Sequence, residues 1–169
     1  DWAASLGLNF TLKPNLAVYA SGTRGYKMPA LDEFLNATSQ QQTELFESKE
    51  VQAVEGGVKG QMGPVGFTVG GFWTKLKNVV SQGLVVDPVT GGSTWIIVPS
   101  PENKSYGAEI ELVANVYRGL QFFGNATILK AELGTGAGAD IGSRINGVPT
   151  SIANAAAVYT APGGIFLKA

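Results

Sequence analysis

Apolar and polar residues alternate along much of this chain with a period of two. The clearest stretch covers 105–116, where every second residue from Tyr106 onward is apolar and Glu109 and Glu111 lie between them. Successive side chains of a β-strand point to opposite faces, so this pattern gives one apolar face and one polar face. A helix would instead place Glu109 beside Leu112 on the same side. The alternation therefore predicts a half-buried strand.

Similar patterns predict seven strands, and an eighth that begins near Ile165. The seven cover about 2–12, 16–26, 49–61, 65–86, 94–116, 120–133 and 149–160. Two of them, 65–86 and 94–116, are far longer than the roughly 5–6 residues usual in globular proteins. The chain is therefore expected to be all-β and antiparallel.

The connections between these strands alternate between short and long without exception. The short ones are 13–15, 62–64, 117–119 and 161–164, and the long ones are 27–48, 87–93 and 134–148. In an up-and-down meander, all short turns then lie at one end of the sheet and all long loops at the other. Transmembrane β-barrels have this asymmetry, whereas Greek-key sandwiches do not sort their loops in this way.

Aromatic residues are also distributed by their distance from the turns. Phe10, Phe67, Tyr117, Phe122, Tyr159 and Phe166 lie within a few residues of a short turn, and Tyr26, Trp73, Trp95 and Tyr106 lie toward the long loops. Aromatic side chains form girdles at both membrane interfaces of transmembrane barrels. The alternative is that these aromatics fill a soluble core. Their clustering favours the membrane.

Composition narrows the classes of function. The 169 residues include 23 glycines, no cysteine and no histidine, and charged residues make up 15%. Without these two residue types the chain lacks the commonest metal ligands, the commonest general base and a thiol nucleophile. The net charge of −1 suggests no nucleic acid as a partner. The longest uncharged stretch, 145–167, is broken by Pro and Gly, so a transmembrane helix is not expected. Residues 1–4 do not resemble the start of a signal peptide.

Two motifs that could indicate ligand binding or catalysis are better explained as parts of a loop and of a barrel wall. Residues 134–139 formally fit a dinucleotide-binding pattern, but no acidic residue lies about 20 positions further on, and a flexible loop is expected. Glu109 and Glu111 lie on one face of a strand, at a separation compatible with glycosidase chemistry. In a barrel, however, they form part of a polar lumen wall. The 27–48 loop is expected to hold a helical turn near 31–35, and it either contacts ligand or only covers the rim.

Several segments resemble the barrels of TonB-dependent outer-membrane receptors. They are the run LAVYASGTRGYKMPAL at 16–31, the stretch from Glu50 to Lys59, and NKSYGAEIEL at 103–112 followed by Gly119-Leu120 and 123–126. Pro149, Asn154 and Tyr159 continue the series. The likeness covers nearly the whole chain.

The resemblance implies a 22-stranded barrel around a plug domain, in the bacterial outer membrane. It also implies that TonB powers uptake of a scarce nutrient, most often a ferric siderophore, with outer-membrane lipid, the plug and TonB as partners. No enzymatic activity and no cofactor are expected. Residues 1–169 would be an internal part of one barrel domain, with the plug and final strands absent. The alternatives are a porin-like or adhesin-like barrel without TonB coupling and a soluble carbohydrate-binding β-sandwich.

Two groups of residues follow as candidates for function. Candidate substrate contacts near the long loops are Tyr26, Lys27, Phe34, Trp95 and Arg144. Polar residues expected to face the lumen are Glu55, Lys59, Glu109, Glu111 and Asn115. No catalytic or metal-binding residue is expected.

Overall fold

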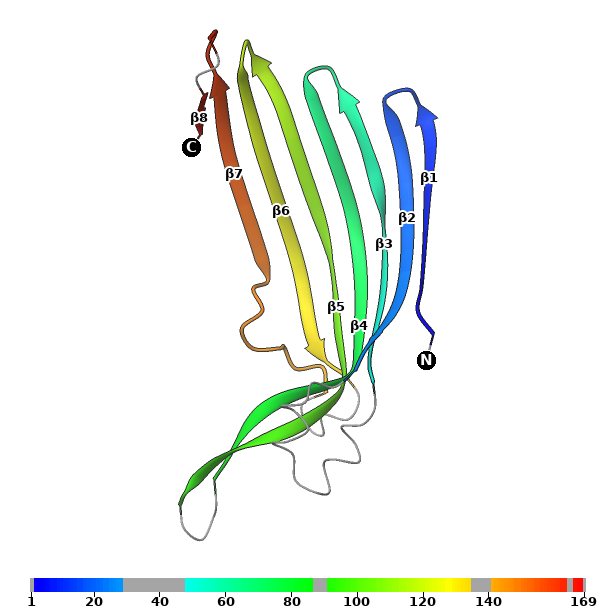
Figure 1. The fold of residues 1–169 in the computed structure, drawn as a ribbon, viewed down its shortest axis with the longest axis vertical. Coiled ribbons are helices and arrows are strands. Elements are labelled where there is room, and N and C mark those ends of the chain that lie inside the picture. The colour runs from blue at the N-terminus through cyan, green and yellow to red at the C-terminus, as the bar shows by residue number, and fades with distance from the viewer. Residues whose placement is uncertain (1, 29–47, 87–90, 135–140, 164–165, 169) are drawn as a thin grey trace.

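The computed structural model describes residues 2–28, 48–86, 91–134, 141–163 and 166–168, without the side chains of 80–86, 94–101 and 166. These residues form one antiparallel sheet whose neighbouring strands follow the order of the chain (Figure 1). The strands are β1 (Ala4–Lys13), β2 (Leu16–Lys27), β3 (Lys49–Met62), β4 (Val65–Val86), β5 (Ser93–Tyr117), β6 (Leu120–Leu133), β7 (Ser151–Thr160) and β8 (Phe166–Lys168). The prediction of an antiparallel meander is confirmed. In the part of the chain described, no helix is long and apolar enough to span a membrane.

The short turns lie together at one end of the sheet, at the top of Figure 1. Gly63 and Gly119 have φ angles of 58° and 75°, in the left-handed region that glycine adopts without steric cost. The first turn is tied to its neighbour, because the Asn15 side chain donates a hydrogen bond of 2.9 Å to the carbonyl of Gln61. These turns hold consecutive strands in a fixed register.

The strand ends that lead into the long connections lie at the opposite end, where β4 and β5 continue as a hairpin beyond their neighbours (Figure 1). The ladder between them breaks once, opposite Asn78, where pairing passes from Lys77↔Glu102 to Val79↔Ser100. Asn78 has a φ of 56°, and its side chain donates to the carbonyl of Ser48 over 3.0 Å. The projecting hairpin begins at this break. The helical turn expected near 31–35 lies outside the described residues.

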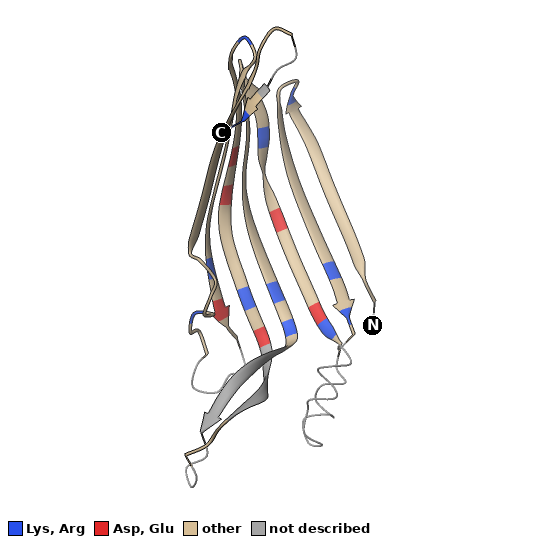
Figure 2. Cartoon of the chain, turned by 60° about the vertical axis from the view of Figure 1, so that its left-hand side comes forward, with Lys and Arg blue, Asp and Glu red and all other residues tan. Residues whose placement is uncertain are grey.

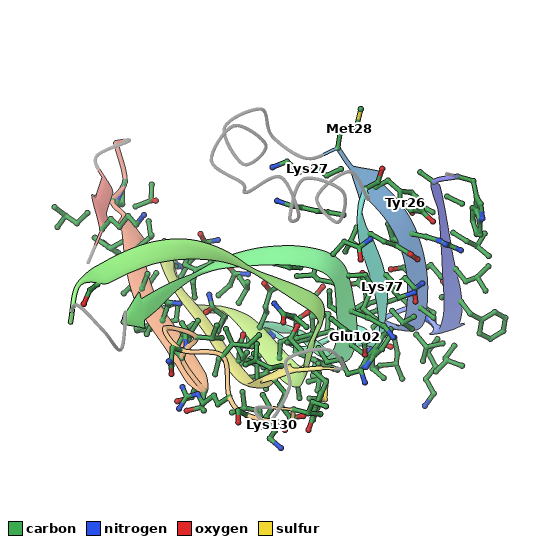
Figure 3. The ribbon with its side chains drawn as sticks, turned by 90° about the horizontal axis from the view of Figure 1, so that it is seen from below. Tyr26, Lys27, Met28, Lys77, Glu102 and Lys130 are labelled. Carbon is green, nitrogen blue, oxygen red and sulfur yellow. The ribbon has the colours of Figure 1, made fainter. Side chains whose placement is uncertain are left out.

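Seen along the strands, the sheet is an open curved wall with β1 and β8 at its two ends (Figure 3). Lys130 points away from the hollow side of the curve, which makes its side of the sheet the convex face, and Lys27 lies toward the hollow side. Among the described residues, Ala131 is the one apolar residue that is buried, at 6% exposure. The strand ladders, rather than a packed core, hold this wall together.

Candidate functional site

The pairing register sorts the side chains of the wall into transverse rows, since directly paired residues share a face. On the convex face, three successive rows contain no charged residue over β2 to β7; on β1, Lys13 pairs with Leu16 at the turn end of the first row. From the turn end they are Leu16–Gly60–Phe67–Leu112–Gly124–Ala155, then Phe10–Val18–Val58–Val69–Ile110–Ala126–Ala153, then Leu8–Ala20–Gly56–Gly71–Ala108–Ile128–Ser151. We call this surface the apolar band.

Aromatic residues border the apolar band on both sides, toward the turns and toward the loops. Tyr117 and Tyr159 lie at the turn end, and Trp73 pairs directly with Tyr106 toward the loops. On β5 the convex-face positions from Tyr106 to Val116 span roughly 33 Å of strand at about 3.3 Å per residue. With a strand tilt of about 40°, this span is roughly 25 Å across a membrane, which matches the apolar belt of outer-membrane barrels.

A band of ion pairs begins in the aromatic row, where Tyr106 pairs with Lys130, and continues toward the loops. We call it the outer charged band, and its members are Arg24, Glu50, Lys75, Lys77, Glu102, Lys104, Lys130, Glu132 and Arg144. Glu102 contacts both Lys75 and Lys104, and its Oε1 lies 2.8 Å from the Nζ of Lys104. Figure 2 shows many of the charged residues gathered near the loop end of the strands.

Polar side chains of the concave face form a second cluster, at the centre of β2 to β5. Ser21 donates a hydrogen bond of 3.0 Å to Glu55, and the ammonium of Lys59 lies 5.9 Å from the centroid of the Tyr19 ring. The Tyr19 ring lies across two glycines of the next strands: a Cβ at Gly57 would meet its ring at 2.9 Å, and one at Gly70 its hydroxyl at 2.6 Å. The missing side chains make room for the tyrosine on this face.

The five polar residues expected to face the lumen all lie on the concave face. Lys59 and Glu111 belong to one row, joined through Thr68, and Glu109 belongs to the next row with Gly70. Glu55 lies one row further toward the loops, and Asn115 accepts a hydrogen bond of 2.6 Å from Gln121 near the turn. The register thus brings four of them together and leaves Asn115 at the turn end.

The five candidate substrate contacts do not form one group. Tyr26 pairs with Glu50 on the convex face, where Arg24 lies 5.3 Å from its ring centroid. Arg144 bridges to Glu132 on the same face and donates to the carbonyl of Val148. Lys27 pairs with Lys49 on the concave face. Trp95 pairs with Leu84 in the projecting hairpin, but its side chain is not described, and Phe34 lies outside the described residues.

Sequence patterns alone did not reveal the outer charged band, the contact of Tyr19 with Lys59 or the hydrogen bond from Ser21 to Glu55. The lysines of the band are dispersed over three strands, and only the register puts Lys75 and Lys104 opposite one another, with Lys130 in the next row. The alternating pattern already predicted on which face of the sheet each lysine lies. It could not predict the offset between neighbouring strands, which determines which lysines become neighbours.

In the described part of the chain, no group of three or more acidic residues is arranged to hold a metal ion. The family model described as "TonB dependent receptor-like, beta-barrel" matches residues 1–167. The chain belongs to this family. TonB-dependent receptor barrels are proteins of the Gram-negative outer membrane, so this barrel segment is an outer-membrane protein. The family consists of transporters and receptors rather than enzymes.

Solved structures of two receptors and a copper transporter share the fold of this chain. The pyoverdine receptor FpvA of Pseudomonas aeruginosa, bound to pyoverdine, matches 95% of the chain with a TM-score of 0.70 and 21% identity. The copper transporter OprC matches 95% with a TM-score of 0.74 and 10% identity. The siderophore receptor PirA of Acinetobacter baumannii matches 99% with a TM-score of 0.69 and 15% identity.

These matches cover only part of each larger receptor. The chain spans 22% of FpvA, 24% of OprC and 28% of PirA. No curated protein matches this chain. The prediction of a barrel segment from this family is confirmed.

The two faces of β5 predict opposite responses to substitution. Ile110 lies in the middle of the apolar band, so Ile110→Arg in the full-length receptor should destabilise the barrel by about 2–4 kcal/mol. Glu111→Gln, one residue away on the concave face, should cost much less because water can solvate that side. Urea titration of the receptor refolded in lipid vesicles measures both. Equal losses, or a larger loss for Glu111→Gln, would show that the faces are assigned the wrong way round.

Proposed function

We propose that this chain forms part of the wall of an active outer-membrane transporter, with its convex face in lipid and its concave face lining the lumen. The observation that carries this proposal is the apolar band, which holds no charged residue over β2 to β7 and lies between aromatic residues whose levels are about 25 Å apart, as in the apolar belt of outer-membrane barrels. The concave face carries Glu55, Lys59, Glu109 and Glu111 at the same depth, where only a wet lumen or a polar plug could solvate them.

The chain is proposed to be one segment of a longer receptor whose plug domain fills the lumen. Two observations support this. The described sheet is open, with β1 and β8 each lacking a neighbour on one side, and an open edge within a bilayer leaves backbone groups without partners. The similar receptors are about four times longer than this chain. Further strands would close the barrel.

The proposed cargo is a ferric siderophore, taken up with energy from TonB. This rests on the siderophore receptors among the similar structures, of which FpvA is bound to pyoverdine. The loop end of the concave face is the proposed route of access, and Lys27 is the described candidate contact there. Tyr26 and Arg144 are left out of this proposal, because the register places both on the convex face.

Uptake of an iron-55 siderophore tests the proposed function. The full-length receptor would be expressed in cells that lack their own siderophore receptors, with and without TonB. Uptake that requires both the receptor and TonB is the expected result. Uptake that persists without TonB would overturn active transport and favour the porin-like alternative.

Two adjacent residues at the end of β2, Tyr26 and Lys27, allow a matched pair of variants that tests the proposed access route. Lys27→Ala removes a cation from the concave face, so the siderophore concentration for half-maximal binding should rise by about tenfold, as expected for one charge-assisted hydrogen bond. Tyr26→Ala, on the convex face, should leave that concentration unchanged. Binding of the labelled siderophore to intact cells at low temperature measures both variants. A stronger effect from Tyr26→Ala would move the access route away from the concave face.

A further inference from the structure

A shallow hollow of about 920 Å³ lies on the convex face, on the turn side of the outer charged band. Its floor consists of small residues from four adjacent strands, namely Ala20, Gly56, Gly71 and Ala108. Larger side chains border it toward the loops, where Val54, Trp73 and Tyr106 form one row that ends at Lys130. The hollow is therefore apolar on its floor and cationic at its loop-side corner.

Every carboxylate of the outer charged band contacts at least one cation, and two of the three contact two cations. Glu102 contacts Lys75 and Lys104, Glu50 lies 2.9 Å from Arg24 and 3.7 Å from Lys77, and Glu132 contacts Lys130 and bridges to Arg144 through the backbone. Six cations thus accompany three carboxylates among the described residues of this band. The band has a surplus of positive charge that its own acidic residues do not neutralise.

Three lysines of the band are more exposed than Glu102. The side chains of Lys75, Lys104 and Lys130 are 21%, 40% and 60% exposed, whereas that of Glu102 is 9% exposed. Glu102 therefore lies beneath the ammonium groups of Lys75 and Lys104, which keep donor hydrogens available to an external anion. In a barrel wall this anion must approach from the lipid side, at the level of the headgroups.

We propose that this surface binds a phosphorylated lipid of the outer leaflet. Its phosphate would accept hydrogen bonds from Lys75, Lys104 and Lys130, and one of its acyl chains would lie in the hollow over Gly71 and Ala108. The inference rests on the proposed placement of the convex face in lipid. A lipid fits better than free phosphate or an acidic protein, because the hollow and the cations adjoin and one lipid carries both matching groups.

The competing explanation is that the lysines serve only to neutralise Glu102 within the wall. The two explanations predict opposite results for Glu102→Gln. If the lysines bind phosphate, removing the carboxylate frees two ammonium groups, and lipid affinity should rise several-fold. If they serve only Glu102, the substitution should leave lipid affinity unchanged and affect stability alone.

The experiment uses the full-length receptor in detergent, titrated with diphosphorylated lipid A and, separately, with its enzymatically dephosphorylated form. Native mass spectrometry measures the bound fraction. Diphosphorylated lipid A should bind more tightly, and Lys75→Gln with Lys104→Gln should weaken it by about tenfold or more, since each lost charge-assisted hydrogen bond is worth at least that factor. Lys59→Gln, which removes a lysine from the concave face, is the matched control and should change nothing.

A second variant tests the hollow without touching the charges. A Cβ at Gly71 would meet only the carbonyl of Gly107, at an ordinary contact distance of 3.5 Å, so Gly71→Leu can be accommodated and its side chain would fill the hollow. Lipid A should bind this variant several-fold more weakly. A thermal melt of each variant checks that it is folded.

Equal binding of the two lipid forms, or lipid affinity unchanged by both the double lysine variant and Glu102→Gln, would overturn the proposal. Its failure is distinguishable from that of the transport function. A receptor that binds lipid A as expected but shows no TonB-dependent iron uptake would contradict only the proposed transport function.

Discussion

The need to pair every backbone N–H and C=O group within a medium that holds almost no water governs this structure. Each strand satisfies the requirement through its neighbours in the sheet, which gives the meander its continuous ladders from β1 to β8. Because Ala131 is the one buried apolar residue among those described, no packed interior competes with these ladders in setting the register. The turns at Gly63 and Gly119 and the ladders they start therefore determine which side chains become neighbours.

The register converts a simple alternation into surfaces of different chemistry. On the convex face it collects the apolar band, then the row of Trp73 and Tyr106, then the outer charged band. On the concave face it collects Glu55, Lys59, Glu109 and Glu111, with Tyr19 lying over Gly57 and Gly70. One thin wall thus separates lipid from a polar interior, and transport and lipid binding are proposed to use opposite faces of the same strands.

Strand positions and facing could be predicted from the sequence because both depend on local period-two alternation, as at Tyr106 to Val116. The sequence also predicted at which end of the sheet each connection lies, because this depends only on the order of short and long connections. Contacts between strands could not be predicted in this way. The convergence of Lys75, Lys104 and Glu102 depends on the offset between β4 and β5. Tyr26 is a candidate ligand contact only because it lies near a long connection, and its pairing with Glu50 places it on the convex face. The ladder break at Asn78 reflects a single left-handed residue that no periodicity marks.

The central claim is that alternate residues of one strand meet lipid and water across the same wall. Nitroxide side chains placed one at a time at 108–113 of β5, in the full-length receptor reconstituted in bilayers, test it directly. Collision rates with molecular oxygen and with a water-soluble nickel chelate would be measured for each position by electron paramagnetic resonance. The account predicts that labels at Ala108, Ile110 and Leu112 collide mainly with oxygen, and labels at Glu109, Glu111 and Val113 collide mainly with nickel. Equal accessibility on both sets, or a period near 3.6 residues, would contradict it.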